Sequence, residues 1–135
     1  MFAEAGLPFT AELDKVPNSR RSLALAELAR DRGLYAELHP RLFDAYWARG
    51  LDLGDEQVLL EEAQAVGLAE DEARAAVGDA VYLERIAEQT AAALELGAGG
   101  VPAWLVDDRL LVPGAQPHEL FDQVLERLGH PPVAP

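Results

Sequence analysis

The fold is decided by residues 100–128, GVPAWLVDDRLLVPGAQPHELFDQVLERL. Two short apolar runs, residues 103–106 and 110–112, are separated by the polar sequence Asp-Asp-Arg at 107–109. Short apolar runs joined by a few turn-forming residues predict a β-hairpin. We therefore expect two antiparallel strands in this part of the chain.

A helix is predicted directly after the second strand. Pro117 is expected at its first position, where the missing N–H costs nothing, and Gly129 is expected to end it. Apolar residues recur along one face of this segment at Leu120, Phe121, Val124, Leu125 and Leu128. The last third of the chain therefore reads as strand, turn, strand and helix.

The chain before residue 98 has helical periodicity almost throughout, after an irregular lead-in over residues 1–17. Asn18 and Asp55 are expected to cap two helices that end at Gly33 and Gly67, which can adopt a left-handed conformation. A short helix is predicted over 69–77. A long one follows over about 79–96, with Leu83, Ile86, Thr90 and Leu94 on one stripe.

Residues 35–50, YAELHPRLFDAYWARG, predict a further helix that is rich in aromatic side chains. Pro40 is expected near its first turn, or between a short turn and the main helix. Phe43, Tyr46 and Trp47 could line a ligand groove. Aromatic residues at helical spacing more often belong to a protein core, and we expect a buried face here.

The predicted fold class is mainly α with a small β-hairpin, that is, α+β. A chain of 135 residues, half of them apolar, has material for one core, so we expect a single domain over residues 1–135. Within it, residues 18–97 form a helical region and residues 98–129 a C-terminal β-β-α segment.

Charge and cysteine content limit the possible functions. Eleven Lys and Arg against 24 Asp and Glu give a formal charge of −13, which disfavours nucleic acid and anionic membrane surfaces as partners. The first residues do not resemble a secretory signal and no segment is long enough to span a bilayer, so a cytoplasmic protein is expected. The absence of cysteine excludes disulfides and thiol nucleophiles within these residues.

No metal ion or cofactor is predicted. His39, His118 and His130 are scattered and lack the spacing of metal ligands, so surface or capping roles are expected. The abundant carboxylates lie on faces that should be solvated, and no catalytic residue is assigned.

The segment 100–128 resembles the C-terminal β-β-α of the FrnE-type branch of the DsbA family, which belongs to the thioredoxin superfamily. The sequences VPNSRRSLALAELARDRG at 16–33 and LHPRLFDAYWARGLDLGDEQVLLEEAQAVGL at 38–68 resemble the all-helical insertion that this family carries inside its thioredoxin fold. The resemblance extends from about Pro17 to Leu128 and implies a disulfide oxidoreductase. The high content of Ala, Leu, Glu and Arg, with a single Lys, suggests a bacterial source.

The resemblance places Val101 and Pro102 in the family's cis-proline loop, where the backbone pairs with a peptide or thiol substrate. The simpler alternative is that Pro102 merely begins a strand. Gly114, Ala115 and Gln116 precede the last helix and could present N–H groups to an anion. A tight connection from strand to helix is the more common role of such a segment.

The chain departs from the family pattern at its beginning. Family members carry a strand and a Cys-x-x-Cys motif before the helical insertion, and these 135 residues have neither. The sequence thus predicts a thioredoxin-like fold without its N-terminal βαβ part. A truncated gene, a misplaced start codon and one half of a split protein all remain open.

Three functions follow from these expectations. The first is a DsbA-type thiol-disulfide oxidoreductase that is inactive alone or depends on a partner chain. The second is a redox-dead module that binds a peptide or protein at the Pro102 loop, and the third is a relative of 2-hydroxychromene-2-carboxylate isomerase. Because a lone two-stranded sheet is marginal, we expect a homodimer, or a complex with a chain supplying the missing half, that covers the edge at residues 103–106.

Overall fold

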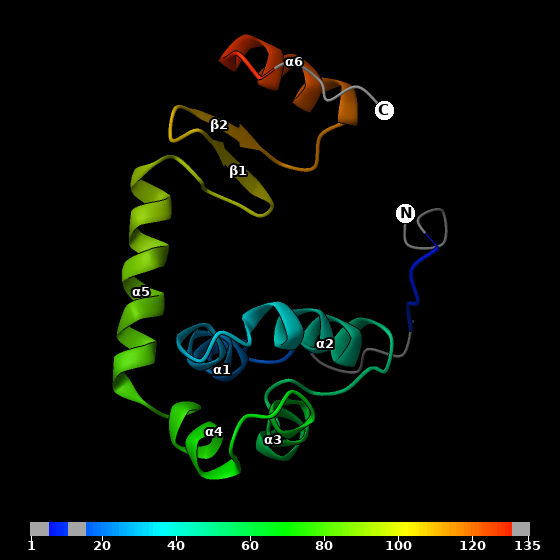
Figure 1. The fold of residues 1–135 in the computed structure, drawn as a ribbon, viewed down its shortest axis with the longest axis vertical. Helices are drawn as coiled ribbons and strands as arrows, with labels where there is room; N and C mark the ends of the chain where they lie inside the picture. The colour runs from blue at the N-terminus through cyan, green and yellow to red at the C-terminus, as the bar shows by residue number, and fades with distance from the viewer. Residues whose placement is uncertain (1–5, 11–15, 131–135) are drawn as a thin grey trace. The chain divides into compact units, whose positions relative to one another are not determined.

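The computed structural model describes residues 6–10 and 16–130 (Figure 1). These residues are mainly helical with one small antiparallel sheet, which confirms the predicted fold class. The elements in chain order are α1 (Arg20–Asp31), α2 (Tyr35–Trp47), α3 (Glu56–Ala65), α4 (Glu70–Ala76), α5 (Ala80–Glu95), β1 (Ala103–Val106), β2 (Leu110–Pro113) and α6 (His118–Leu128).

The chain divides into two compact units, Met1–Ala87 and Glu88–Pro135. We call them the helical unit and the hairpin unit. The division between the units lies inside α5. It is upstream of residue 98, where the sequence predicts that the β-β-α segment begins.

The helical unit is built around one apolar core. Its largest fully buried side chains are Leu25, Leu38, Leu59 and Leu60, which come from α1, α2 and α3. Each of these helices carries apolar residues at spacings of three and four, so one face of each helix turns inward. Smaller side chains of α4 complete the core at Ala73 and Ala76.

The N-cap side chain makes a capping hydrogen bond at the start of α3 but not at the starts of α1, α2 and α4. The Asp55 carboxylate accepts a hydrogen bond of 2.8 Å from the Gln57 N–H, which confirms Asp55 as the cap of α3. In α1 the N-cap is Ser19, one residue later than predicted. Asn18 still contributes, because its Oδ1 accepts a hydrogen bond of 3.1 Å from the Arg20 N–H.

Prolines and glycines mark other helix positions. Pro40 lies inside α2, beyond its first turn, so the prediction of a separate short turn was wrong and the helix continues through the proline. Pro117 is the N-cap of α6 and not its first helical residue. Gly33 and Gly67 have φ of 71° and 91°, the left-handed conformation predicted for them.

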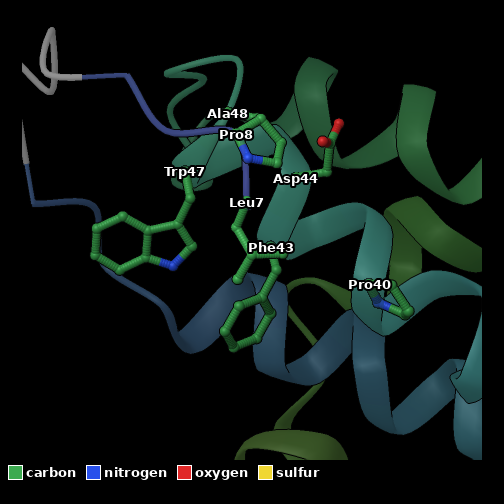
Figure 2. A pocket seen from close by; sticks show the side chains of 7 residues that line it. All are labelled: Leu7, Pro8, Pro40, Phe43, Asp44, Trp47 and Ala48. Carbon is green, nitrogen blue, oxygen red and sulfur yellow. The ribbon is translucent and has the colours of Figure 1, made fainter. Parts of the chain in front are cut away.

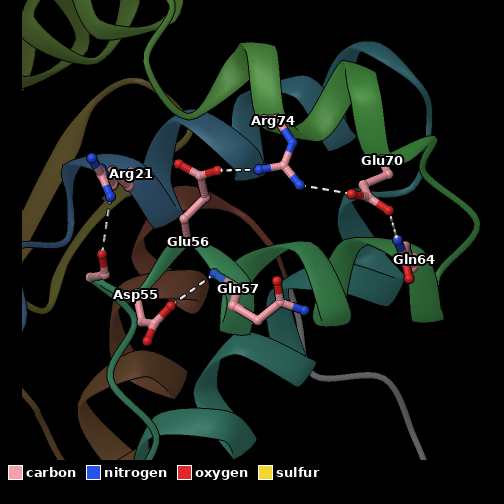
Figure 3. Close-up of polar contacts among 8 residues, drawn as sticks. Arg21, Asp55, Glu56, Gln57, Gln64, Glu70 and Arg74 are labelled. Atoms are coloured by element: carbon pink, nitrogen blue, oxygen red, sulfur yellow. Dashed lines mark hydrogen bonds and ion pairs between the residues drawn. The ribbon is translucent and has the colours of Figure 1, made fainter.

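Polar side chains connect α3 and α4 on the surface (Figure 3). The Arg74 guanidinium contacts Glu56 at 2.6 Å and Glu70 at 2.7 Å. The Gln64 amide also donates to Glu70, at 2.7 Å. Because all these groups are exposed and screened by solvent, each ion pair adds little to stability.

A buried carboxylate connects α2 and α3. Glu62 is 3 % exposed and accepts from Arg41 at 2.9 Å and from Arg49 at 2.7 Å. Arg49 also contacts Asp44 at 3.0 Å. A carboxylate at this depth requires such partners, because burying an unpaired charge is costly.

The first half of α5 is attached to α1 by polar contacts. Arg85 lies 2.8 Å from Asp31 and 3.4 Å from Glu27. No residue of α5 is buried, although the sequence places Leu83, Ile86, Thr90 and Leu94 on one stripe of this helix. Leu94 is 59 % exposed.

The hairpin unit contains the predicted antiparallel sheet. Ala103 pairs with Pro113 and Val106 with Leu110. Asp107 and Asp108 have φ of 54° and 52°, and the Arg109 N–H donates to the Val106 carbonyl at 3.1 Å. Positive φ at both central residues is the geometry of a type I′ turn, which suits the twist of a hairpin.

Candidate functional site

The predicted Val101–Pro102 loop lies directly before β1. Its peptide bond is cis, and the Val101 side chain is 97 % exposed. The Gly114 N–H donates to the Pro102 carbonyl at 2.8 Å, which adds one backbone contact beyond the Ala103–Pro113 pair. The loop is therefore attached to the sheet while Val101 projects from it.

The second predicted segment, Gly114 to Gln116, follows β2. Gly114 has φ of 78°, and the Gln116 amide Nε2 donates to the Pro113 carbonyl at 2.8 Å. Because the Gly114 N–H is bonded to the Pro102 carbonyl, the two predicted segments meet at the open end of the hairpin. Anion binding by this segment stays a prediction. The Gly114 N–H is already bonded to the Pro102 carbonyl.

The hairpin is apolar on both faces. Trp104 and Val112 form a pair on one face, where the Trp104 ring contacts the Phe121 ring of α6 edge to face at 5.5 Å. Leu105 and Leu111 form a pair on the other face. Trp104 is still 50 % exposed and Leu105 41 %. Two apolar faces are typical of a strand inside a larger sheet protein.

Histidines and acidic groups form isolated contacts. His130 Nε2 lies 2.6 Å from the Asp107 carboxylate, and the His39 ring lies between the rings of Tyr35 and Phe43. Over residues 6–10 and 16–130, no three His, Asp or Glu side chains gather where they could hold a metal ion. No helix of the same residues is long and apolar enough to cross a membrane.

One surface of α2, which we call the aromatic face, overlaps the ligand groove at Phe43 and Trp47 that the sequence allowed but for which we expected a core role. It consists of Tyr35, His39, Phe43 and Trp47 of α2, four residues apart and therefore on one row of the helix. Ring centroids are 4.9 Å apart for Tyr35 and His39 and 4.8 Å apart for His39 and Phe43. The spacing of four was the signal in the sequence.

The prediction that Phe43, Tyr46 and Trp47 form a buried face was wrong for Phe43. Phe43 is 55 % exposed, and Tyr46 and Trp47 are half-buried. α2 instead buries Leu38, Leu42 and Ala45. Successive helical residues are rotated by about 100°, so the row containing Phe43 turns away from the core that Leu42 enters.

A cavity of about 360 Å³ lies at the Trp47 end of the aromatic face (Figure 2). Its lining is apolar except for one carboxylate: Leu7, Pro8, Pro40, Phe43, Asp44, Trp47 and Ala48. The Thr10 N–H donates to the Trp47 carbonyl at 2.7 Å, and the Phe9 and Trp47 rings stack at 6.1 Å. These two contacts hold the entering segment against the end of α2.

The order of elements, five helices followed by β1, β2 and α6, is the order expected for the helical and C-terminal parts of a thioredoxin-like protein. A model of the DSBA-like thioredoxin domain matches residues 1–126. The chain therefore belongs to this family.

The chain is also similar to a solved structure, that of a probable DsbA oxidoreductase from Streptomyces coelicolor. The two share 28 % sequence identity with a TM-score of 0.86. The match covers 99 % of this chain and 58 % of the Streptomyces chain, so this chain spans little more than half the length of that protein. No curated protein sequence matches it.

Proposed function

We propose that these 135 residues are the helical and C-terminal β-β-α part of a thiol-disulfide oxidoreductase of the FrnE-like branch. The observation that carries the proposal is the family match over residues 1–126 in a chain without cysteine. Disulfide exchange requires a thiolate to attack sulfur. The reactive cysteines must therefore come from polypeptide outside residues 1–135, and these residues alone are inactive.

In this proposal the Val101–Pro102 loop holds the substrate. Val101 is almost fully exposed at the point where the chain enters β1, so an extended peptide can approach its backbone. A peptide beside this loop adds to the sheet through main-chain hydrogen bonds, as in β-strand addition. Gly114 has a supporting role, because its N–H is bonded to the Pro102 carbonyl.

The same proposal assigns roles to the two parts of the chain. Residues 18–97 correspond to the helical insertion and residues 98–129 to the end of the thioredoxin-like fold. In the described residues β1 is paired only with β2. The other edge of β1 is the position for a strand of the complementing polypeptide, in the same protein or in a partner chain. Pairing with a second copy is the alternative.

The test compares the chain alone with the chain joined to the portion of the Streptomyces protein that has no counterpart here. We expect disulfide reduction of a model peptide at background rate for the chain alone and above background for the joined chain. Replacing the cysteines of the added portion by serine must abolish the gain. Exchange by the 135 residues alone, or a joined chain that stays at background, contradicts the proposal.

A second function is favoured by the exposed Val101 in a chain without thiols: a redox-dead module that binds a peptide at the same loop. This function predicts that the chain alone binds extended peptides. Titration with a fluorescent peptide separates the two, since the oxidoreductase proposal needs the complementing polypeptide for a complete binding groove. A Val101→Pro variant, which lacks the N–H of residue 101, is the matched control.

A further inference from the structure

Gln116 lies in the connection from β2 to α6, and its side chain is bonded to the main chain. The amide Nε2 donates to the Pro113 carbonyl at 2.8 Å. Pro117 is the N-cap of α6, so Gln116 precedes the helix. Because Gln116 is exposed, the contact is not needed to satisfy a buried amide. Its effect falls on the backbone at the end of β2.

The contact holds one half of a peptide unit whose other half is bonded to the predicted substrate loop. The Pro113 carbonyl and the Gly114 N–H belong to the same planar unit, and in a trans unit they point in opposite directions. The carbonyl accepts from Gln116, while the N–H donates to the Pro102 carbonyl at 2.8 Å. A rotation of this unit that breaks one of these hydrogen bonds therefore misaligns the other.

The backbone at this position does not by itself fix the orientation of the unit. Gly114 has φ of 78°, and glycine adopts positive and negative φ with similar ease. The ring of Pro113 fixes its φ and leaves its ψ free. Since a peptide unit turns by changing the preceding ψ and the following φ, a side-chain contact can decide which orientation it keeps. Gln116 supplies such a contact.

The pair formed by residues 102 and 114 can make only one main-chain hydrogen bond. These residues face each other one step beyond the Ala103–Pro113 pair. Facing residues of an antiparallel sheet can exchange two hydrogen bonds. Pro102 has no N–H, so the bond from the Gly114 N–H is the one that remains. The attachment of the loop at Pro102 thus depends on the orientation of the 113–114 unit.

Val101 is connected to this attachment through Pro102. Because the pyrrolidine ring fixes φ of Pro102, a single free torsion, ψ, relates the bonded Pro102 carbonyl to the peptide unit before it. That unit carries the Val101 carbonyl, and Val101 itself is 97 % exposed. Holding the Pro102 carbonyl therefore restricts the directions in which the main chain at Val101 can meet an extended peptide.

We infer that Gln116 is a positioning residue for the Val101–Pro102 loop. It holds the 113–114 peptide unit, whose N–H holds the Pro102 carbonyl, and through Pro102 it orients the main chain at Val101. The inference rests on the proposed function, in which this loop holds the substrate. It goes further by naming a side chain outside the loop that sets the affinity for an extended peptide. Gln116 acts through the backbone and does not touch the peptide.

The first test follows the Gly114 amide in the 135-residue chain. Gln116→Met keeps a side chain of similar length and removes its N–H donors. We expect the Gly114 N–H to exchange with solvent severalfold faster in this variant, because a hydrogen bond at an exposed position contributes modestly. The Val112 amide, at the position facing Trp104, should keep its rate. An unchanged Gly114 amide, or equal acceleration at Val112, overturns the inference.

Two further variants separate the lost donor from other changes. Gln116→Glu keeps the shape of the side chain but has no donor at neutral pH, so it should accelerate exchange at Gly114 as Gln116→Met does. Gln123→Met is the matched control, because Gln123 is also exposed but lies within α6, and it should leave the Gly114 amide unchanged. Acceleration by Gln116→Glu alone indicates charge repulsion and overturns the inference, as does acceleration by Gln123→Met.

The second test asks whether the effect reaches a bound peptide. It uses the chain joined to the portion of the Streptomyces protein that has no counterpart here, and it measures disulfide reduction over a range of concentrations of a model peptide. We expect Gln116→Met to raise KM severalfold with kcat nearly unchanged, because an interaction made equally in the bound substrate and the transition state affects binding alone. A fall in kcat without a change in KM contradicts the inference.

The inference and the proposed function fail in different ways. A joined chain with Gln116 intact that reduces no disulfide contradicts the proposed function, and the Gly114 amide then decides alone whether Gln116 holds the loop. An active joined chain whose KM does not respond to Gln116→Met keeps the oxidoreductase and overturns the positioning role. A melting temperature that falls in Gln116→Met, with protection lost throughout the hairpin unit, means a purely structural role and also overturns it.

Discussion

The helical unit and the hairpin unit differ in how far each closes its own core. Leu25, Leu38 and Leu59 are 0 % exposed in the helical unit. In the hairpin unit the buried apolar side chains of the described residues are Val112 and Val124, at 5 % and 7 %. Stability follows the apolar area removed from water. The helical unit therefore has a core of its own. The hairpin unit buries few apolar side chains and leaves others exposed.

The largest expected effect breaks the core of the helical unit. Leu59→Ala removes a fully buried side chain that packs among α1, α2 and α3, and should lower the free energy of unfolding by about 2–5 kcal/mol. The free energy of unfolding is measured by urea titration, with far-ultraviolet circular dichroism as the signal. Leu23→Ala, at an exposed position of α1, should change the midpoint little.

A smaller loss is expected at the buried carboxylate. Glu62→Ala leaves Arg41 without its carboxylate partner and Arg49 with only Asp44. We expect the free energy of unfolding to fall by about 2 kcal/mol. The loss is smaller than for a fully buried ion pair because both arginines are partly exposed. Glu56→Ala removes a surface ion pair with Arg74 and should leave the midpoint of the same urea titration nearly unchanged.

In the hairpin unit a core substitution should act locally. Val112→Ala deletes two methyl groups beneath α6 and should cost about 1–1.5 kcal/mol. The loss should appear as faster amide hydrogen exchange in β1, β2 and α6, while the amides of α1 and α3 keep their protection. Equal acceleration in all helices would mean that the two units unfold together.

The smallest effect is a pH dependence at the junction of α1 and α5. The hydrogen bond from Arg85 holds the pKa of the Asp31 carboxyl below its usual value. A carboxyl whose pKa is lower in the folded state stabilises the fold at pH values above its unfolded-state pKa of about 3.9. This stabilisation is lost as the pH falls through the folded-state pKa. Arg85→Met should therefore be less stable than the wild type at pH 7, and the difference should shrink by pH 3, measured as urea midpoints.

Local patterns predicted most of the elements. The cap at Asp55, the glycine ends of α1 and α3, and the hairpin followed from turn and capping chemistry that acts between near neighbours. The row of α2 that turns inward did not follow, because Leu42 and Phe43 are both apolar and helix periodicity alone does not decide between adjacent rows. The packing of α1 and α3 against α2 decides it.

The candidate site was predictable in part. The resemblance of residues 100–128 to a known family marked Val101 and Pro102, and the contact between Pro102 and Gly114 follows from hairpin register. The cavity beside Trp47 was not predictable. It depends on the segment at Leu7 and Pro8 lying against α2, which no short-range pattern in the sequence specifies.

The hydrogen bond between Thr10 and Trp47 has a consequence for assembly. Because Phe9 and Thr10 belong to the same chain as α2, their contacts with Trp47 are intramolecular. A covalently attached segment is then present at an effective concentration of roughly millimolar, whereas a separate chain must reach that level by diffusion. Weak individual contacts at this helix are therefore enough to retain a tethered segment, and a free one would need much higher affinity.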